Sequence, residues 1–220
     1  MKNISLIDED FMDFPIGEFP YDKNHSAMGE YHFIHYPGFY GRWYDPVCNY
    51  RYNGQGASWC IMEYNGRHYM EQMRLHNTEP HRTFPTLETG DRFWRDYDIE
   101  AGLRMFNTKW GSAGIGFCAQ NSLNLLACIF EDKKLKLVYR HKEDVEEIKS
   151  VDFDYNCDDT YNIKVSVKGS HVICSVDGST YIDVQTDYAL HAVCINFRSS
   201  SIPHLSAPSV KTGRILVTWI

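Results

Sequence analysis

Three acidic residues, Asp96, Asp98 and Glu100, stand at alternate positions in the run DYDIE at 96–100. On a β-strand, alternate side chains share a face, so the three carboxylates would project to one side while the residues between them pack inward. Carboxylate pairs hydrolyse glycosides when they lie about 5–5.5 Å apart (retaining enzymes) or about 6.5–9.5 Å apart (inverting enzymes). Same-face neighbours lie about 7 Å apart, which suits Asp96 with Asp98, whereas Glu100 would need a bulge to approach Asp96.

The same pattern has a second interpretation, the solvated face of an antiparallel sheet, on which polar and apolar residues alternate. The negative charges would then be balanced by Arg95, Arg104 and lysines of a neighbouring strand. We favour this interpretation and assign no catalytic residue. The three carboxylates remain the alternative set for a glycoside hydrolase, so the sequence leaves enzymatic activity open.

A second candidate is the aromatic and polar stretch HYPGFYGRWYDP at 35–46, which its glycines and prolines keep from forming a helix. Flat rings offer an apolar surface to the C–H side of a sugar, and planar polar groups bind its hydroxyls. The sugar-binding residues predicted here are Tyr40, Arg42, Trp43, Tyr44 and Asp45. The alternative is that these rings hold a long loop against the body of the protein.

Metal binding is not favoured by the sequence. The pair His32 and His35 would point to opposite faces of a strand. A run of closely spaced loop carboxylates offers the oxygen ligands that Ca²⁺ prefers, but a plain acidic loop is the interpretation that we favour. These carboxylates are Asp152, Asp154, Asp158 and Asp159. We therefore predict no cofactor, with Ca²⁺ as the alternative.

Composition narrows the class of protein. The 220 residues carry a formal net charge of −7 without a basic stripe, which argues against a nucleic-acid partner. No apolar run approaches the roughly 18 residues of a membrane span, and the N-terminus lacks the pattern of a signal peptide. The seven cysteines are an odd number without a C-x-x-C pair, which is typical of a reducing compartment. We predict a cytoplasmic protein without a membrane partner.

A sheet must position these candidate residues. The run YNIKVSVKGSHVICSVDG at 161–178 is apolar at every second position on both sides of Gly169, which predicts a hairpin with a tight turn. Similar runs predict further strands at 30–36, 58–66, 68–75, 95–106, 112–119, 123–132, 134–141, 179–185, 190–198 and 213–220. Short strands at close spacing predict one all-β domain over 1–220, an antiparallel β-sandwich.

The connections between these strands are less regular. The charged run 142–153 is predicted to be either a helical turn or a surface loop, and 75–91 and 199–213 are predicted to be long loops. The last predicted strand reaches Ile220 without a polar tail. The domain is therefore expected either to be self-contained or to be a module of a longer polypeptide.

The order of strands and turns resembles the concanavalin A-like (laminin G-like) jelly-roll superfamily, especially its bacterial sugar-binding and glycoside-processing domains. The resemblance covers about half of the chain, residues 91–198, and rests on FWRDYDIEAGLRMF, GIGFCAQ, FEDKKLKLVYR and DTYNIKVSVKGSHVICSVDG. It implies a jelly-roll sandwich in which RILVTW at 214–219 is the closing strand. Lectins, binding modules and hydrolases all share this fold, so the resemblance alone does not decide the activity.

The resemblance also implies roles for single residues. Laminarinase-type hydrolases of this superfamily carry their carboxylates at the spacing of 96–100, but Asp96 stands where those enzymes have Glu. The jelly-roll register would place Gln120 and Arg140 at strand ends, facing outward beside a groove, with Trp94 and Tyr139 as further sugar contacts.

We therefore expect a non-catalytic, lectin-like carbohydrate-binding module that works beside a catalytic domain of the same or another polypeptide. The alternatives are a glycoside hydrolase and a domain that only packs against another protein.

Overall fold

The computed structural model describes residues 7–18, 27–28, 34–35, 38–40, 43–45, 59–72, 86–90, 94–105, 112–121, 124–142, 144–157, 159–190 and 195–199. In these ranges the regular structure is β-strand except for one 3₁₀ turn, η2 (Asp187–Leu190). The strand pairs are antiparallel, which confirms the predicted all-β antiparallel class. No helix among the described residues has the length and apolar character needed to cross a bilayer.

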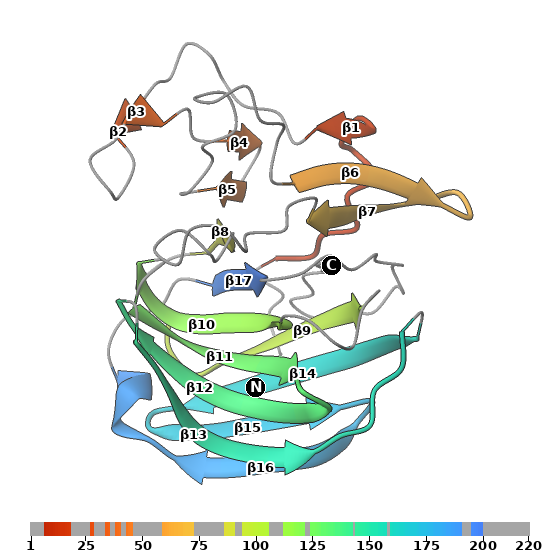
Figure 1. Cartoon of the computed structure of the whole chain (residues 1–220). Helices are drawn as coiled ribbons and strands as arrows, with labels where there is room; N and C mark the ends of the chain where they lie inside the picture. Colours follow the sequence, from red (N-terminus) through yellow and green to blue (C-terminus); the bar gives the residue numbers. More distant parts are fainter. Residues whose placement is uncertain are drawn as a thin grey trace.

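Two sheets lie face to face and form the sandwich (Figure 1). The four-stranded sheet has the order β16 (Ser179–Gln185), β15 (His171–Val176), β14 (Thr160–Lys168), β9 (Tyr97–Arg104). The eight-stranded sheet has the order β13 (Asp144–Asp152), β12 (Lys134–His141), β11 (Asn124–Glu131), β10 (Ala113–Asn121), β17 (Ile195–Ser199), β8 (Thr86–Thr89), β5 (Trp43–Asp45), β4 (Gly38–Tyr40).

The N-terminal strands form two smaller sheets. One joins β1 (Gly17–Glu18), β6 (Trp59–Tyr64) and β7 (Arg67–Gln72), and the other pairs β2 (Ala27–Met28) with β3 (Ile34–His35). The turn between β6 and β7 has positive φ at both Asn65 (52°) and Gly66 (71°). Two such residues make the tight hairpin turn that the Asn-Gly pair predicts.

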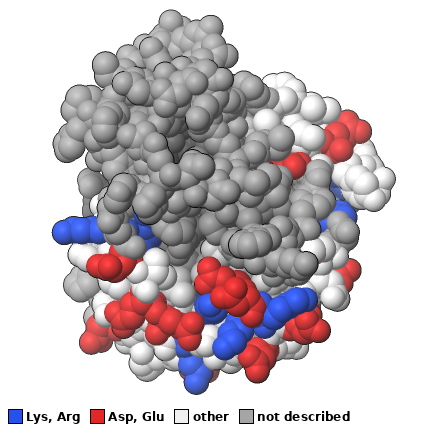
Figure 2. Space-filling model, in the orientation of Figure 1, with Lys and Arg blue, Asp and Glu red and all other residues white. Residues whose placement is uncertain are grey.

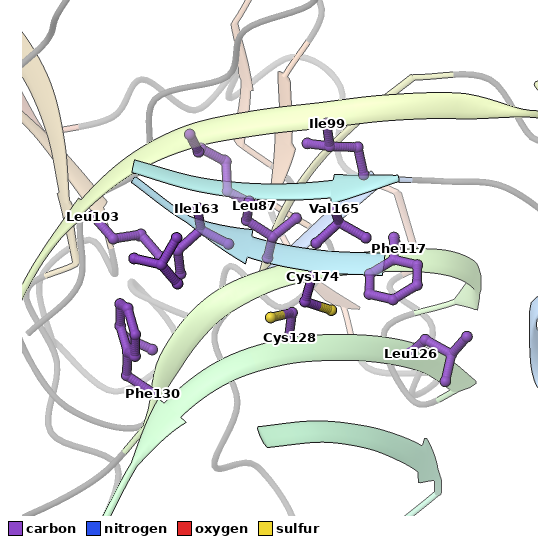
Figure 3. Close-up of a cluster of buried hydrophobic side chains, with 14 of the residues drawn as sticks. Leu87, Ile99, Leu103, Phe117, Leu126, Cys128, Phe130, Ile163, Val165 and Cys174 are labelled. Carbon is purple, nitrogen blue, oxygen red and sulfur yellow. The ribbon is translucent and has the colours of Figure 1, made fainter. Parts of the chain in front are cut away.

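The main core lies between the two large sheets. The predicted hairpin 161–178 is present as β14 and β15, and Gly169 has the positive φ of 56° that its turn requires. Figure 3 shows residues of this hairpin and of β9 facing residues of β10 and β11. The buried side chains include Ile99, Leu103, Phe117, Leu126, Cys128, Phe130, Ile163, Val165 and Cys174. Because alternate side chains of a strand share a face, these residues form one continuous apolar layer.

The opposite face of the eight-stranded sheet is buried as well. A second apolar cluster consists of Ala119, Leu125, Ala127, Ile129 and Val138, on β10, β11 and β12. Strand β11 is consequently buried on both faces, which explains why its sequence is an almost continuous apolar run rather than an alternating one.

Some predicted connections are wrong. The charged run predicted as a helical turn or loop forms β13, an edge strand whose largely exposed side chains leave no apolar periodicity to detect. Charged residues on an edge strand also discourage pairing with another chain. Part of the predicted loop 75–91 is β8, which is buried between β17 and β5.

Two strand predictions are only partly met, and one is not covered. Of the predicted strand 190–198, Leu190 belongs to η2 and the described strand part is β17, from Ile195. Of the predicted strand 30–36, the described part is β3. The predicted loop 199–213 and closing strand 213–220 lie outside the described residues, apart from Ser199.

Replacing Gly114 by Ala should destabilise the sandwich strongly. A Cβ at Gly114 would lie 1.9 Å from the Cys128 carbonyl oxygen and 2.6 Å from the Ile129 Cα. Both atoms are backbone, so β10 must move away from β11, and we expect a loss of about 3 kcal/mol in the free energy of unfolding. Urea denaturation measures this loss.

The matched control is Gly178→Ala, because Gly178 has a φ of +81° but nothing within 4 Å of an added Cβ. It should lose only about 1 kcal/mol, from backbone strain. Equal losses in the two variants would contradict the close approach of β10 to β11.

Candidate functional site

The acidic run 96–100 lies at the start of β9 with the alternation that the sequence predicts. Tyr97 and Ile99 are buried in the core, whereas Asp98 is exposed and Glu100 half-buried on the outer face of the four-stranded sheet. Asp96 precedes the strand at a φ of 52°, and its Oδ1 accepts a hydrogen bond of 2.8 Å from the Gly169 backbone N–H.

The carboxylates of β9 have partners on the neighbouring β14. Lys164 Nζ lies 2.9 Å from Asp98 Oδ2, and the side-chain amide of Asn162 donates to Glu100 Oε1 over 2.6 Å. Partial burial alone would raise the pKa of Asp98, but hydrogen bonds from Lys164 and Ser166 and the Lys164 charge lower it overall. A glycosidase acid needs a raised pKa. Asp98 is therefore suited to pairing with a cation rather than to donating a proton at neutral pH.

Of the sugar-binding residues predicted in the stretch 35–46, Trp43 is the one whose side chain the structure describes. Trp43 is fully buried, its Nε1–H donates to Glu9 Oε2 over 3.0 Å, and its ring packs on Phe11 at 5.5 Å between centroids. A ring without exposed area cannot stack on a sugar, so Trp43 belongs to the core.

The structure does not describe the side chains of the other residues in that set. Tyr40, Tyr44 and Asp45 are described only as backbone of β4 and β5, and Arg42 lies outside the described residues. Their role in sugar binding stays a prediction.

The sugar contacts predicted from the jelly-roll register differ in their exposure to solvent. Gln120 is exposed near the end of β10, and Trp94 is half-buried beside Gly90. Arg140 was expected to face outward but is only 3% exposed, and its Nε–H donates to the Lys142 carbonyl over 2.9 Å. Arg140 shares a face of β12 with Val138 of the second apolar cluster, and burial of that face places the arginine inside.

Tyr139 takes part in a group that we call the aromatic stack, formed by Tyr139, Tyr188 and His141. The Tyr139 and Tyr188 rings are parallel within 7° at 4.0 Å, and the His141 ring lies 6.3 Å from Tyr139. The Tyr188 hydroxyl donates to Glu146 Oε2 over 3.0 Å. The sequence gives no sign that Tyr188, His141 and Glu146 belong together, because η2 meets β12 and β13 only after the chain has folded.

A small hollow of about 90 Å³ lies where η2 meets the ends of the sheets. Its lining comes from β9, β10, the β14–β15 connection and η2, and consists of Arg95, Asp96, Tyr97, Cys118, Val167, Gly169 and Ala189. At its base, the Cys118 backbone N–H donates to the Tyr97 hydroxyl over 3.2 Å. The volume is far below the roughly 300 Å³ of an ordinary ligand pocket. The hollow is therefore too small to serve as an enclosed ligand pocket.

Charges of both signs alternate on the outside of the sandwich. On the side shown in Figure 2, lysines and arginines are interleaved with acidic side chains among the described residues. Lys136, for example, lies 3.0 Å from Glu131 and 3.3 Å from Asp132. Mixed charges of this kind produce no strong field of one sign, which suits a neutral ligand better than a polyanion.

The acidic segment after β13 does not form a metal site in its described part. Asp154 pairs with Lys133 at 2.9 Å, and Asp159 accepts a hydrogen bond from the Asn156 amide at 3.2 Å. Among the described residues, no three His, Cys, Asp or Glu side chains are grouped to hold an ion, and Asp158 lies outside this set.

Glu71 is an acid with a perturbed pKa that the sequence does not reveal. It is only 4% exposed, and burial raises its pKa to about 7, although a hydrogen bond with Tyr69 opposes the shift. Burial and the Glu71 charge raise the pKa of Tyr69 to about 12, while the charge of Arg104 opposes this. Perturbed acids of this kind are candidates for functional sites. In the run RHYMEQ, nothing distinguishes Glu71 from an exposed strand residue, because its burial arises from packing.

The fold resembles those of known proteins, although the sequence does not. No protein-family model matches the sequence, and no curated protein matches it. Similar solved structures include a carbohydrate-binding module CBM66 from Bacillus subtilis, with a TM-score of 0.52 and 11% identity over 72% of this chain and 90% of that one. Another is a prokaryotic β-1,3-1,4-glucanase (lichenase) derived from a mouse hindgut metagenome, with a TM-score of 0.48 and 12% identity over 86% and 82%. The chain is an antiparallel β-sandwich of the concanavalin A-like jelly-roll type.

The raised pKa of Glu71 predicts that stability falls as the pH rises. The folded protein holds the Glu71 proton up to about pH 7, whereas the unfolded chain loses it near the ordinary glutamate pKa of 4.5. Stability is therefore greatest below the unfolded pKa and declines between the two values. Between about pH 5 and pH 8 we expect a loss of about 2 kcal/mol that Glu71→Gln abolishes, measured by urea denaturation.

Glu63→Gln is the control, because Glu63 is an exposed glutamate of the same β6–β7 hairpin. It should leave the pH dependence unchanged. An identical pH profile for Glu71→Gln and the unmodified chain would show that Glu71 is ionised normally in the folded state.

Proposed function

We propose that this protein is a non-catalytic carbohydrate-binding domain that recognises a glycan at the aromatic stack. The observation that carries the proposal is the parallel pair of Tyr139 and Tyr188, half-exposed at the η2 end of the sandwich. Tyr188 would present its outer face to the C–H side of a sugar ring. The Tyr139 ring, stacked against the other face of Tyr188, holds it in place.

Polar groups around the stack can bind the hydroxyls of the sugar. The carboxylate of Glu146 and the imidazole of His141 are exposed beside the rings. Asn124 is opposite His141 in the β11–β12 ladder, and its amide donates to Asn121 Oδ1 over 2.8 Å. These groups stand on paired strands, which hold binding residues more rigidly than loops do.

The similar solved structures support a carbohydrate ligand without deciding between binding and hydrolysis. One is described as a carbohydrate-binding module and another as a glucanase. We propose the binding role because Asp98 and Glu100 are engaged by Lys164 and Asn162 on an outer sheet face. A pair of catalytic carboxylates would instead flank a bound sugar from two sides.

The proposal extends to the setting of the domain. We place it in the cytoplasm, as a laminin G-like module of the bacterial glycan-binding type that serves a catalytic domain of the same or another polypeptide. Its ligand is a neutral glycan, and nucleic acid and membranes are not among its partners.

Truncating Tyr188 should weaken glycan binding. A glycan array would identify a ligand, and titration calorimetry would compare the unmodified chain with Tyr188→Ala and Tyr188→Phe. Loss of the ring should reduce affinity about tenfold, the equivalent of about 1.4 kcal/mol, whereas Tyr188→Phe keeps the stacking surface and should lose less.

Tyr181→Ala is the matched control, since Tyr181 is an exposed tyrosine of β16 that packs edge-on against Phe153. It should bind as the unmodified chain does. Absence of any bound sugar at millimolar concentration, or equal losses in Tyr181→Ala and Tyr188→Ala, would refute the site.

The hydrolase alternative has its own measurement. We expect no release of reducing sugar from a panel of glycans by the unmodified chain. Release that disappears in Asp98→Asn and Glu100→Gln would instead establish the hydrolase.

A further inference from the structure

Two cysteines face each other in the centre of the main core. Cys128 belongs to β11 of the eight-stranded sheet, and Cys174 belongs to β15 of the four-stranded sheet. Both are fully buried, and both are free thiols. Figure 3 shows their side chains directed into the layer between the two sheets.

The two side chains are neighbours in this layer (Figure 3). The neighbouring Cys174 thiol and burial together raise the pKa of Cys128 well above its ordinary value. Their neighbours along the ladders are core residues, with Ile115 and Leu137 beside Cys128 and Val165 and Ile182 beside Cys174. Apolar residues of the neighbouring strands therefore flank both thiols.

The buried thiol of Cys118 has different surroundings from those of Cys128 and Cys174. Cys118 is 3% exposed, but its sulfur lies 3.5 Å from the Tyr97 hydroxyl and 3.6 Å from the Ala189 carbonyl oxygen. Its contacts are with oxygen atoms of neighbouring elements, whereas those of Cys128 include another sulfur.

We propose that Cys128 and Cys174 form a redox site, at which a disulfide bond joins the two sheets of the sandwich. The oxidant is a small-molecule disulfide such as oxidised glutathione. In the reducing cytoplasm proposed above, the bond persists because its burial keeps reducing agents from reaching it. One cysteine thiolate attacks it and forms a mixed disulfide, releasing one glutathione thiol. The other cysteine then displaces the second glutathione thiol. The two cysteine sulfurs lose two electrons and two protons in total, and the glutathione disulfide gains both.

Burial determines when this reaction can take place. Exchange requires a thiolate that is accessible to the oxidant, and a buried thiol with a raised pKa supplies almost none. The bond therefore forms while the sheets are apart, during folding or a transient opening of the sandwich. Once it has formed, the same burial protects it from reducing agents.

The cross-link should stabilise the fold. It would close a loop that contains β12, β13 and β14, and a closed loop restricts the unfolded chain. For a chain of this length we expect the melting temperature to rise by about 5–10 °C. The two sheets are otherwise held together mainly by apolar contacts, so a covalent link between them resists their separation directly.

Oxidative refolding tests the proposal. The full chain is unfolded in reductant, refolded in a mixture of reduced and oxidised glutathione, blocked with iodoacetamide and digested with chymotrypsin for mass spectrometry. Chymotrypsin is chosen because Leu125 and Leu126 separate Cys118 from Cys128, and Tyr181 and Tyr188 separate Cys174 from Cys194.

The expected result is a linked peptide pair that contains Cys128 and Cys174, together with the higher melting temperature. Folded, reduced protein kept in the same glutathione mixture should form the link much more slowly. Cys118→Ala should retain both the link and the rise in melting temperature, whereas Cys128→Ala and Cys174→Ala should lose both.

Peptide mapping of the unmodified chain decides the matter even if an alanine variant fails to fold. Recovery of Cys128 and Cys174 as alkylated thiols after refolding, or linked to other cysteines, would overturn the proposal. Rapid formation of the link in the folded protein would support the pairing but overturn the role assigned to burial.

Discussion

The structure depends on burial of the alternating apolar faces of two antiparallel sheets against each other. Val165 of β14 and Phe117 of β10 belong to opposite sheets and meet in one continuous core (Figure 3). Each fully buried side chain of this size contributes about 1.5–3 kcal/mol from removal of apolar surface from water. Since the side-chain period is two, the same contacts set the direction of every neighbouring residue on these strands.

That constraint explains why polar groups gather where they do. On β9, burial of Tyr97 and Ile99 turns Asp98 toward the outer face and into contact with Lys164. On β12, Tyr139 and His141 lie on the same face as the core residues but closer to the end of the strand, at the end of the sandwich. There η2 packs against the sheet end and brings Tyr188 onto Tyr139.

The core also accommodates groups with chemistry of their own. The thiols of Cys128 and Cys174 lie between the sheets, where they pack as small apolar side chains while reduced. Glu71 lies in the β6–β7 hairpin near Tyr69, and its burial favours the neutral form. Both cases follow from desolvation, which disfavours the charged form of an acid whether it is a thiol or a carboxyl.

Sequence alone determined the class of the sandwich, the hairpin 161–178 and the two faces of β9, because period-two alternation and tight-turn residues are local signals. It left β13 undetected, because an exposed edge strand has no apolar periodicity. Only the tertiary structure decided that Arg140 is buried and that Tyr188 stacks on Tyr139. Alternation defines two faces of a strand, but contacts between residues distant in sequence determine whether a second layer covers either of them.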